Sequence, residues 1–198
     1  MPVMKHVENE ILVVWNNFQT GDKEAFAHLY NQYVEILYRY GTKLTNNHEL
    51  VKDAIQEIFL ELYVNRKNNN TDPTNLKYYL ILALKRNIIK KIKRTRRNIN
   101  AVTINESIFD PVYSIEKKII DDELKREKNK RVVNALKQIP PKQKEALYLR
   151  YNEGLGYDEI SGILNISKDS VRKQVYRALK KIKSGIDAKG FLYWMFSK

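Results

Sequence analysis

The sequence predicts an all-α protein made of two small helical domains joined by a linker, with a helix-turn-helix in the C-terminal domain. Its 198 residues give room for two modest cores. Only seven glycines and five prolines interrupt it, apolar residues recur at spacings of three and four, and no stretch shows the alternation of a strand. We expect the first domain at residues 1–97, the linker at 98–123, the second domain at 124–186 and an apolar tail at 187–198.

The first two helices of the first domain are marked by their ends. Gly21 is placed to stop the first helix, because glycine readily adopts the left-handed conformation that follows a helix. Asp22 can then cap a second helix with its side-chain oxygen, and we expect that helix to stop at Gly41. The apolar stripes are Ile11, Leu12, Trp15 and Phe18 in the first helix and Phe26, Leu29, Tyr30, Tyr33, Leu37 and Tyr40 in the second.

Two more helices complete the first domain. Asn47 is a capping residue for the third helix, which gives way to the polar segment NRKNNNTDPTN, predicted to be a loop. The fourth helix begins near Leu76 and runs into the basic sequence KKIKRTRR. The apolar sides of these helices are Leu50, Val51, Ala54, Ile55, Ile58, Phe59 and Leu62, and then Tyr79, Leu80, Ala83, Leu84, Ile88 and Ile92.

The second domain begins where helical periodicity returns. The pattern is lost over residues 98–123, which predicts the linker. It returns over 124–139, and Pro140 and Pro141 then end one helix and begin the next.

Residues 142–183 have the spacing of a helix-turn-helix, with three helical stretches separated by NEGLG and NIS. Gly156 begins the middle helix, Asn165 ends it, and Ser167 caps the last one. The apolar side of the last helix is Val171, Val175, Ala178, Leu179 and Ile182, and it packs against Ile160 and Leu164.

The charge distribution points to a nucleic acid partner. The formal net charge is +13, and a field of that sign attracts polyanions. Residues 1–75 carry 7 Lys and Arg against 10 Asp and Glu, whereas residues 76–198 carry 29 against 13. This segregation predicts a protein surface as the partner of the front of the chain and DNA as the partner of the rear.

Composition excludes several other classes. No cysteine is present, which rules out disulfides, thiol redox sensing and a zinc knuckle. The three histidines are not clustered, and no glycine-rich phosphate loop or nucleophile motif occurs, so we expect neither enzyme activity nor a cofactor. No signal-peptide layout and no apolar run of roughly 20 residues is found, which predicts a cytoplasmic protein without membrane insertion.

The last helix carries a cationic face opposite its apolar side. A recognition helix reads base edges in the major groove with its N-terminal residues, whereas cations farther along grip phosphates. The alternative is a cationic face that is only solvated. The base-reading candidates are Lys168, Ser170, Arg172 and Lys173, Tyr176 lies on the same face, and the phosphate-binding candidates are Arg177, Lys180 and Lys181.

The fourth helix of the first domain is a second candidate for DNA binding. Tyr78 and Tyr79 follow Lys77 on its first turn, and aromatic rings beside cations suit unstacked bases. Because aromatics at helical spacing are usually core, we expect at least one of the two tyrosines to be buried. Eight cations without an acid then follow, a run that indicates phosphate contacts or, alternatively, a solvated tail: Lys85, Arg86, Lys90, Lys91, Lys93, Arg94, Arg96 and Arg97.

From about Phe18 to Ile186 the chain resembles extracytoplasmic-function (ECF) sigma factors, the small initiation factors of bacterial RNA polymerase. GDKEAFAHLYNQYVEILYRYGTKLT is similar to the opening helices of the family, and ELVKDAIQEIFLELY to its polymerase-docking helix. NLKYYLILALKRNIIKKIKRTRR resembles the segment that reads and melts the minus-ten element, with the A-x-x-x-N element at Ala83 and Asn87. ALKQIPPKQKEALYLRYNEGLGYDEISGILNISKDSVRKQVYRALKKIK resembles the domain that binds the minus-thirty-five element.

The resemblance implies an alternative sigma factor that binds core RNA polymerase and directs promoter binding, strand opening and transcription initiation. Residues 1–97 would be region 2 and residues 124–186 region 4. An anti-sigma factor is a further partner that the family admits, and the tail at 187–198 either packs on the second domain or contacts such a partner. The implied polymerase contacts are Asp53, Gln56, Glu57 and Phe59, and the implied minus-ten contacts are Lys77, Tyr78, Tyr79, Arg86, Asn87, Lys90, Lys91 and Arg94.

Three positions depart mildly from the family pattern. Tyr79 stands where tryptophan is usual, Gly156 where a capping serine is frequent, and Ser170 where threonine is common. These changes leave the promoter preference open.

Two other functions remain as alternatives. A helix-turn-helix regulator that acts without polymerase would need only the second domain, and binding of core polymerase would separate it from a sigma factor. A nucleic-acid enzyme would need a metal on Asp53, Glu57 and Glu61, but carboxylates four residues apart on a helix are more often a solvated or partner-facing stripe.

Overall fold

The computed structural model describes residues 2–69, 71–98, 109 and 138–185, and these contain helices and turns but no strand. The chain divides into two compact units, Met1–Asn105 and Glu106–Lys198. The all-α prediction with two helical domains is therefore confirmed. The predicted linker apart from residues 98 and 109, the helix expected over 124–139 apart from its last two residues, and the tail lie outside the described residues, so the boundaries drawn there stay predictions.

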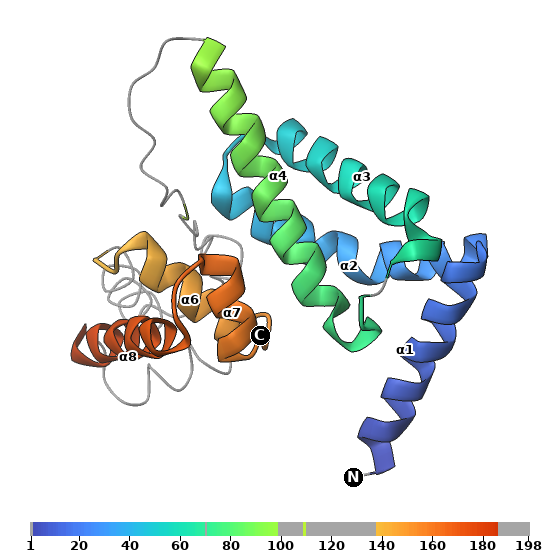
Figure 1. Cartoon of the computed structure of the whole chain (residues 1–198). Helices are drawn as coiled ribbons and strands as arrows, with labels where there is room; N and C mark the ends of the chain where they lie inside the picture. Colours follow the sequence, from blue (N-terminus) through green and yellow to red (C-terminus); the bar gives the residue numbers. More distant parts are fainter. Residues whose placement is uncertain (1, 70, 99–108, 110–137, 186–198) are drawn as a thin grey trace, which may run out of the picture. The chain divides into compact units, whose positions relative to one another are not determined.

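The described residues of the first unit form four α-helices: α1 (Pro2–Thr20), α2 (Lys23–Leu44), α3 (His48–Val64) and α4 (Leu76–Asn98). α2, α3 and α4 pack on one another, and α1 packs on α2 (Figure 1). Each helix buries most of the apolar stripe that its sequence predicts, because a helix with one apolar side is stable only when that side leaves water. Leu12, expected in the stripe of the first helix, is 42% exposed. Fully buried side chains from all four helices meet in this core, among them Phe18, Leu37, Tyr40, Phe59, Leu62, Leu80, Leu84 and Ile88.

The predicted helix ends of the first unit are largely confirmed. Gly21 follows α1 with a φ of 99°, in the left-handed region. The Asp22 carboxylate accepts a hydrogen bond from the Glu24 N–H at 2.8 Å, and the Asn47 side chain accepts one from the Leu50 N–H at 3.0 Å. Both contacts satisfy backbone donors that the first turn of a helix leaves without intrahelical partners.

Gly41 does not stop α2, which contradicts the sequence-based expectation. The helix continues to Leu44, and Gly41 is buried inside it. A Cβ atom at this position would lie 2.6 Å from Val51 Cγ1 and 3.4 Å from Ile88 Cδ1. The glycine therefore lets α2 approach α3 and α4 closely.

The polar segment before α4 contains two short 3₁₀ turns, Arg66–Asn68 and Pro73–Asn75, where the sequence predicted only a loop. The Gln19 amide of α1 donates to the Asn69 carbonyl at 3.0 Å. The Arg66 guanidinium donates to the Tyr63 carbonyl at 2.9 Å and lies over the Tyr63 ring. These contacts fix the approach of the chain to α4.

The second unit contains α6 (Pro141–Tyr151), α7 (Tyr157–Leu164) and α8 (Lys168–Gly185), each in contact with the other two (Figure 1). The three predicted helices and the helix start at Pro141 are confirmed. Asn165 ends α7 with a φ of 51°, in the left-handed region. The buried side chains that join the helices include Ala146, Leu147, Leu149, Ile160, Ile163, Val171, Val175, Ala178 and Ile182.

The helix starts in the second unit also agree with the sequence. The Glu159 carboxylate accepts a hydrogen bond from the Gly156 N–H at 2.6 Å, at the start of α7. The Ser167 hydroxyl accepts one from the Ser170 N–H at 3.2 Å, at the start of α8. Leu164 and Leu179, expected in the core, are only partly buried. Within the described residues, no helix is long and apolar enough to cross a membrane.

Candidate nucleic-acid interface

The outer side of α4 is cationic because its inner side is committed to the core. Leu80, Leu84 and Ile88 are fully buried, and the residues on the opposite side of the helix therefore turn toward solvent. The side chains of Arg96 and Arg97, which the sequence assigned to the same run, lie outside the described set. The exposed cations are Arg86, Lys90 and Arg94, and the partly exposed ones are Lys77, Lys85, Lys91 and Lys93.

Tyr78 and Tyr79 are both partly exposed, so the expectation that one of them is buried is wrong. The core positions beside them are taken by Leu76 and Leu80, which are fully buried. Burial raises the pKa of the Tyr79 hydroxyl, and the negative charge of Glu61 on α3 raises it further. Tyr79 therefore stays neutral and able to donate a hydrogen bond near physiological pH.

Glu57 on α3 joins residues that the sequence assigned to different partners. Its carboxylate accepts a hydrogen bond from the Asn87 amide at 2.9 Å and another from the Lys91 ammonium at 2.6 Å. These two hydrogen bonds, that from Lys91 first, lower the pKa of Glu57 below its ordinary value. A predicted polymerase contact is thus bonded to two predicted minus-ten contacts.

The outer face of α3 carries the other predicted polymerase contacts. Asp53, Gln56 and Glu57 are exposed, but Phe59 is only 2% exposed. The Phe59 ring lies 4.8 Å from the Tyr30 ring, so it supports the helix from the core and its placement in a surface contact is corrected.

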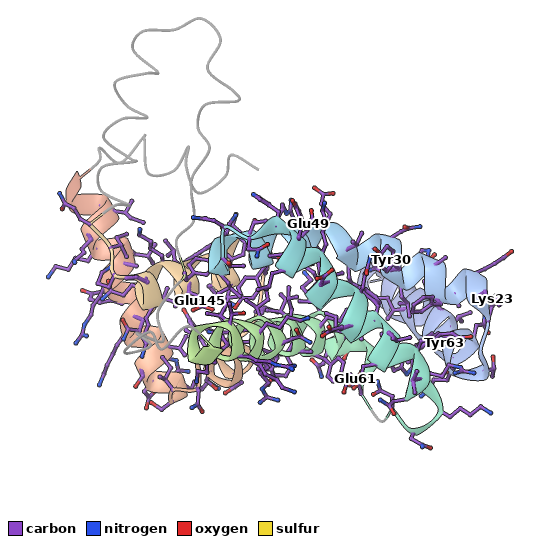
Figure 2. The ribbon with its side chains drawn as sticks, turned by 90° about the horizontal axis from the view of Figure 1, so that it is seen from above. Lys23, Tyr30, Glu49, Glu61, Tyr63 and Glu145 are labelled. Atoms are coloured by element: carbon purple, nitrogen blue, oxygen red, sulfur yellow. The ribbon has the colours of Figure 1, made fainter. Side chains whose placement is uncertain are left out.

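Sequence reasoning missed two exposed apolar residues on α3. Leu60 and Val64 are 63% and 65% exposed. They follow Asp53 and Gln56 at helical spacing, on the same side of the helix, and this spacing was the signal that could have identified them. Figure 2 shows the length of this helix from Glu49 to Tyr63, with α4 alongside.

The predicted cationic face of α8 is present. Ser170 is partly buried, and its hydroxyl lies 2.8 Å from the Ser167 hydroxyl, so it takes part in the helix cap. The exposed side chains of this face are Lys168, Arg172, Lys173, Tyr176, Arg177, Lys180 and Lys181.

Two base-reading candidates on α8 contact residues to which the sequence assigned no role in DNA binding. The Lys168 ammonium lies 2.6 Å from the Asp158 carboxylate. The Arg172 guanidinium lies 3.2 Å from the Asp169 carboxylate and 5.7 Å from the centre of the Tyr157 ring. The first turn of α7 therefore contacts the recognition helix at two cations.

No group of three or more potential ligands close enough to hold a metal ion occurs in the part of the chain that the structure describes.

Comparisons with known families agree with both helical units. A family model described as Sigma-70 region 2 matches residues 29–98, and one described as Sigma-70, region 4 matches residues 129–182. The chain belongs to the sigma-70 family. The first match spans α3 and α4 and the second spans the helix-turn-helix, so a helix-turn-helix regulator that lacks a polymerase-docking domain is not favoured.

Curated relatives place this sigma factor among the ECF members. It is 25% identical over 157 residues to the ECF RNA polymerase sigma factor SigM of Bacillus subtilis, covering 79% of this chain and 91% of the relative. It is 24% identical over 166 residues to the RNA polymerase sigma factor CarQ of Myxococcus xanthus, covering 84% and 91%. The protein is an alternative sigma factor that directs RNA polymerase in transcription initiation.

Solved structures share the fold of the sigma factor. CnrH, in complex with the cytosolic domain of CnrY, is 17% identical, with a TM-score of 0.54 over 87% of this chain and 94% of that one. RpoE of Bartonella quintana, in complex with the anti-sigma factor NepR, is 16% identical, with a TM-score of 0.53 over 81% and 95%.

Proposed function

We propose that this sigma factor docks on core RNA polymerase through α3 and reads two promoter elements through α4 and α8. The observation that carries the proposal is that each unit exposes a cationic helix face opposite a buried apolar side, while α3 exposes an acidic and apolar face beside the first of them. Residues 1–97 act as region 2 and residues 124–186 as region 4.

The docking face consists of Asp53, Gln56, Glu57, Leu60 and Val64. Two apolar side chains exposed beside carboxylates suit a partner that buries them and offers cations at the rim, since the cores of interfaces are apolar and their rims are polar. Such a partner differs in charge from DNA, which the carboxylates would repel. Core RNA polymerase is the partner that the family membership indicates.

The minus-ten face handles single-stranded DNA of the nontemplate strand. A base that leaves the duplex costs a few kcal/mol, and an aromatic ring can recover about 1 to 3 kcal/mol by stacking. The partly exposed rings of Tyr78 and Tyr79 provide this platform at the start of α4, and the cations that follow contact phosphates. The face consists of Lys77, Tyr78, Tyr79, Arg86, Asn87, Lys90, Lys91 and Arg94.

The minus-thirty-five face enters the major groove of duplex DNA. The N-terminal half of α8 reads bases, because recognition helices insert with that end, and the cations farther along bind phosphates. The Ser167–Ser170 cap holds the start of the helix. The face consists of Lys168, Ser170, Arg172, Lys173, Tyr176, Arg177, Lys180 and Lys181.

An anti-sigma factor is the further partner that we propose, on the ground that RpoE of Bartonella quintana was solved with one. The chain would act in the cytoplasm, where core polymerase works, and would supply binding and strand opening rather than catalysis of its own.

Run-off transcription tests the proposal. Core enzyme and the full chain are supplied with a pool of templates whose two promoter elements are randomised at fixed spacing. We expect transcripts that form only when the chain is present and whose templates have both promoter elements in common. At limiting chain concentration, the Gln56→Ala variant should yield fewer transcripts than the parent. If the chain does not bind core enzyme, or adds no transcripts to those of core enzyme alone, the proposal is wrong.

A further inference from the structure

We propose that the polymerase and two side chains of α4, Asn87 and Lys91, compete for the carboxylate of Glu57, so that docking releases Asn87 and Lys91 for DNA. This inference rests on the proposed function. It makes Glu57 a positioning residue for the minus-ten face in the free chain and a contact residue in the polymerase complex.

The geometry shows that both oxygens of Glu57 are in use. Oε2 accepts from the Asn87 amide at 2.9 Å and Oε1 from the Lys91 ammonium at 2.6 Å, across the contact between α3 and α4. The Glu57 side chain is nevertheless 53% exposed. A partner surface can therefore reach the carboxylate, and a cation of that partner would weaken its bonds to α4.

The side-chain amide of Asn87 is only partly satisfied while it is bonded to Glu57. The Asn87 Oδ1 atom is buried and has no hydrogen-bond partner among the described residues. A buried acceptor without a partner is unfavourable. A rotation of the Asn87 side chain that brings Oδ1 to a hydrogen-bond donor would therefore lower the free energy. Loss of the Glu57 contact would permit that rotation.

Lys91 differs from Asn87 in that its polar group is satisfied, because the Glu57 carboxylate neutralises its charge. An ammonium that pairs with Glu57 attracts a phosphate less strongly than a free one, and the carboxylate beside it repels the phosphate. Release of Glu57 would remove both obstacles. The Lys91 side chain is 28% exposed, and a partly exposed ion pair of this kind changes affinities by a small factor, about 2- to 5-fold.

Competition of this kind is reciprocal. If docking on polymerase weakens the contacts of Glu57 to α4, then removal of those contacts must strengthen docking by the same factor. If the contacts of Glu57 only stabilise the packing of α3 on α4, their removal should weaken docking, because it would disturb α3. The sign of the change in polymerase affinity therefore decides between the two.

The test measures the affinity of the full chain for core polymerase at low salt. Lys91→Ala should tighten binding about 2- to 5-fold, and Asn87→Ala should tighten it less. Lys23→Ala is the control for net charge, because Lys23 lies at the start of α2 and outside the three faces (Figure 2). Unchanged or weaker binding by Lys91→Ala, in a variant that melts like the parent, overturns the inference. If Lys91→Ala melts early, the same criterion applies to Asn87→Ala.

Two further variants separate this inference from the proposed function. Gln56→Ala should weaken polymerase binding, and if it does not, the docking face itself is wrong. Glu57→Gln should raise the affinity of the free chain for a single-stranded oligonucleotide about 2- to 5-fold. If Gln56→Ala weakens docking while Glu57→Gln leaves DNA affinity unchanged, the result supports the docking face and contradicts the competition for Glu57.

Discussion

At the scale of single residues, Arg172 is held before it meets DNA. Its guanidinium lies 3.2 Å from Asp169 and 5.7 Å from the centre of the Tyr157 ring, and the same ring lies 4.9 Å from the Arg150 guanidinium. A guanidinium that is held in one plane loses less entropy when it forms two hydrogen bonds to a guanine edge. Tyr157 therefore positions Arg172, although it lies on α7.

We expect Tyr157→Leu to reduce discrimination at the base pair that we propose Arg172 to read by about 2- to 5-fold, because an exposed cation–π contact contributes about 0.5 to 1 kcal/mol. Tyr157→Phe keeps the ring and should discriminate like the parent. The measurement is competitive binding of holoenzyme to promoters that differ at single upstream base pairs. Equal discrimination by both variants would show that the ring does not position Arg172.

Gly41 gives a prediction about stability. Gly41→Ala should lower the free energy of unfolding by about 1 to 3 kcal/mol, the usual effect of overpacking a core. The reason is that the added Cβ would lie 2.6 Å from Val51 Cγ1, which is fully buried. Urea denaturation of the parent, the single variants and Gly41→Ala with Val51→Ala measures this. The double variant should lose less stability than the two single losses together, and strict additivity would contradict the account.

At the scale of elements, the pairing of α3 with α4 depends on pH. The Glu57 pKa lies below its ordinary value of 4.5 because Lys91 and Asn87 bind the charged form. The stabilisation is therefore fully present above the unfolded-state pKa and is lost as the pH falls through the lowered pKa of the folded chain.

Glu57→Gln removes this titration and leaves the other carboxylates in place. We expect the parent to melt at a higher temperature than the variant at pH 7, by a small margin because the pair is exposed. The gap should narrow as the pH is lowered below about 4.5, the ordinary value for this group. A gap that stays constant from pH 7 to pH 3 would show that Glu57 does not titrate with folding.

The first turn of α4 gives a prediction about strand opening. Alanine at Tyr78 or at Tyr79 should leave closed-complex formation largely intact but reduce permanganate-reactive thymines in the promoter bubble, for the ring on which a base stacks. The loss of one stacked base costs about 1 to 3 kcal/mol. The corresponding Phe variants keep the ring and serve as controls. If both Ala variants fold and open promoters like the parent, the stacking platform lies elsewhere on α4.

At the scale of the whole molecule, the sequence predicted what local chemistry determines. Asp22, Asn47 and Ser167 were identified as helix caps because a capping side chain bonds only to the next turn. Most side chains of the buried stripes followed from helical spacing alone, whereas Leu12, Leu164 and Leu179 were also expected in the core and are not fully buried. The two exposed cationic faces followed in the same way, as the sides opposite those stripes.

Contacts between distant segments could not be predicted in this way. The role of Gly41 depends on Val51 and Ile88, which approach only when three helices pack together. Helical spacing placed Phe59 on the apolar side of its helix, whereas the family resemblance made it a polymerase contact, because a resemblance assigns roles to positions without giving their burial. The bond between Glu57 and Lys91 joins residues 34 positions apart on different helices, and neither position indicates the other.

The division of the chain into two compact units has a consequence for how this protein evolves. Each unit buries apolar residues of its own, and the proposed docking face lies in the first unit while α8, the proposed duplex-reading helix, lies in the second. We therefore expect that a mutation in α8 redirects the factor to new genes without altering its share of the polymerase pool. Conversely, a change in α3 can raise or lower that share while the set of upstream sequences is inherited unchanged.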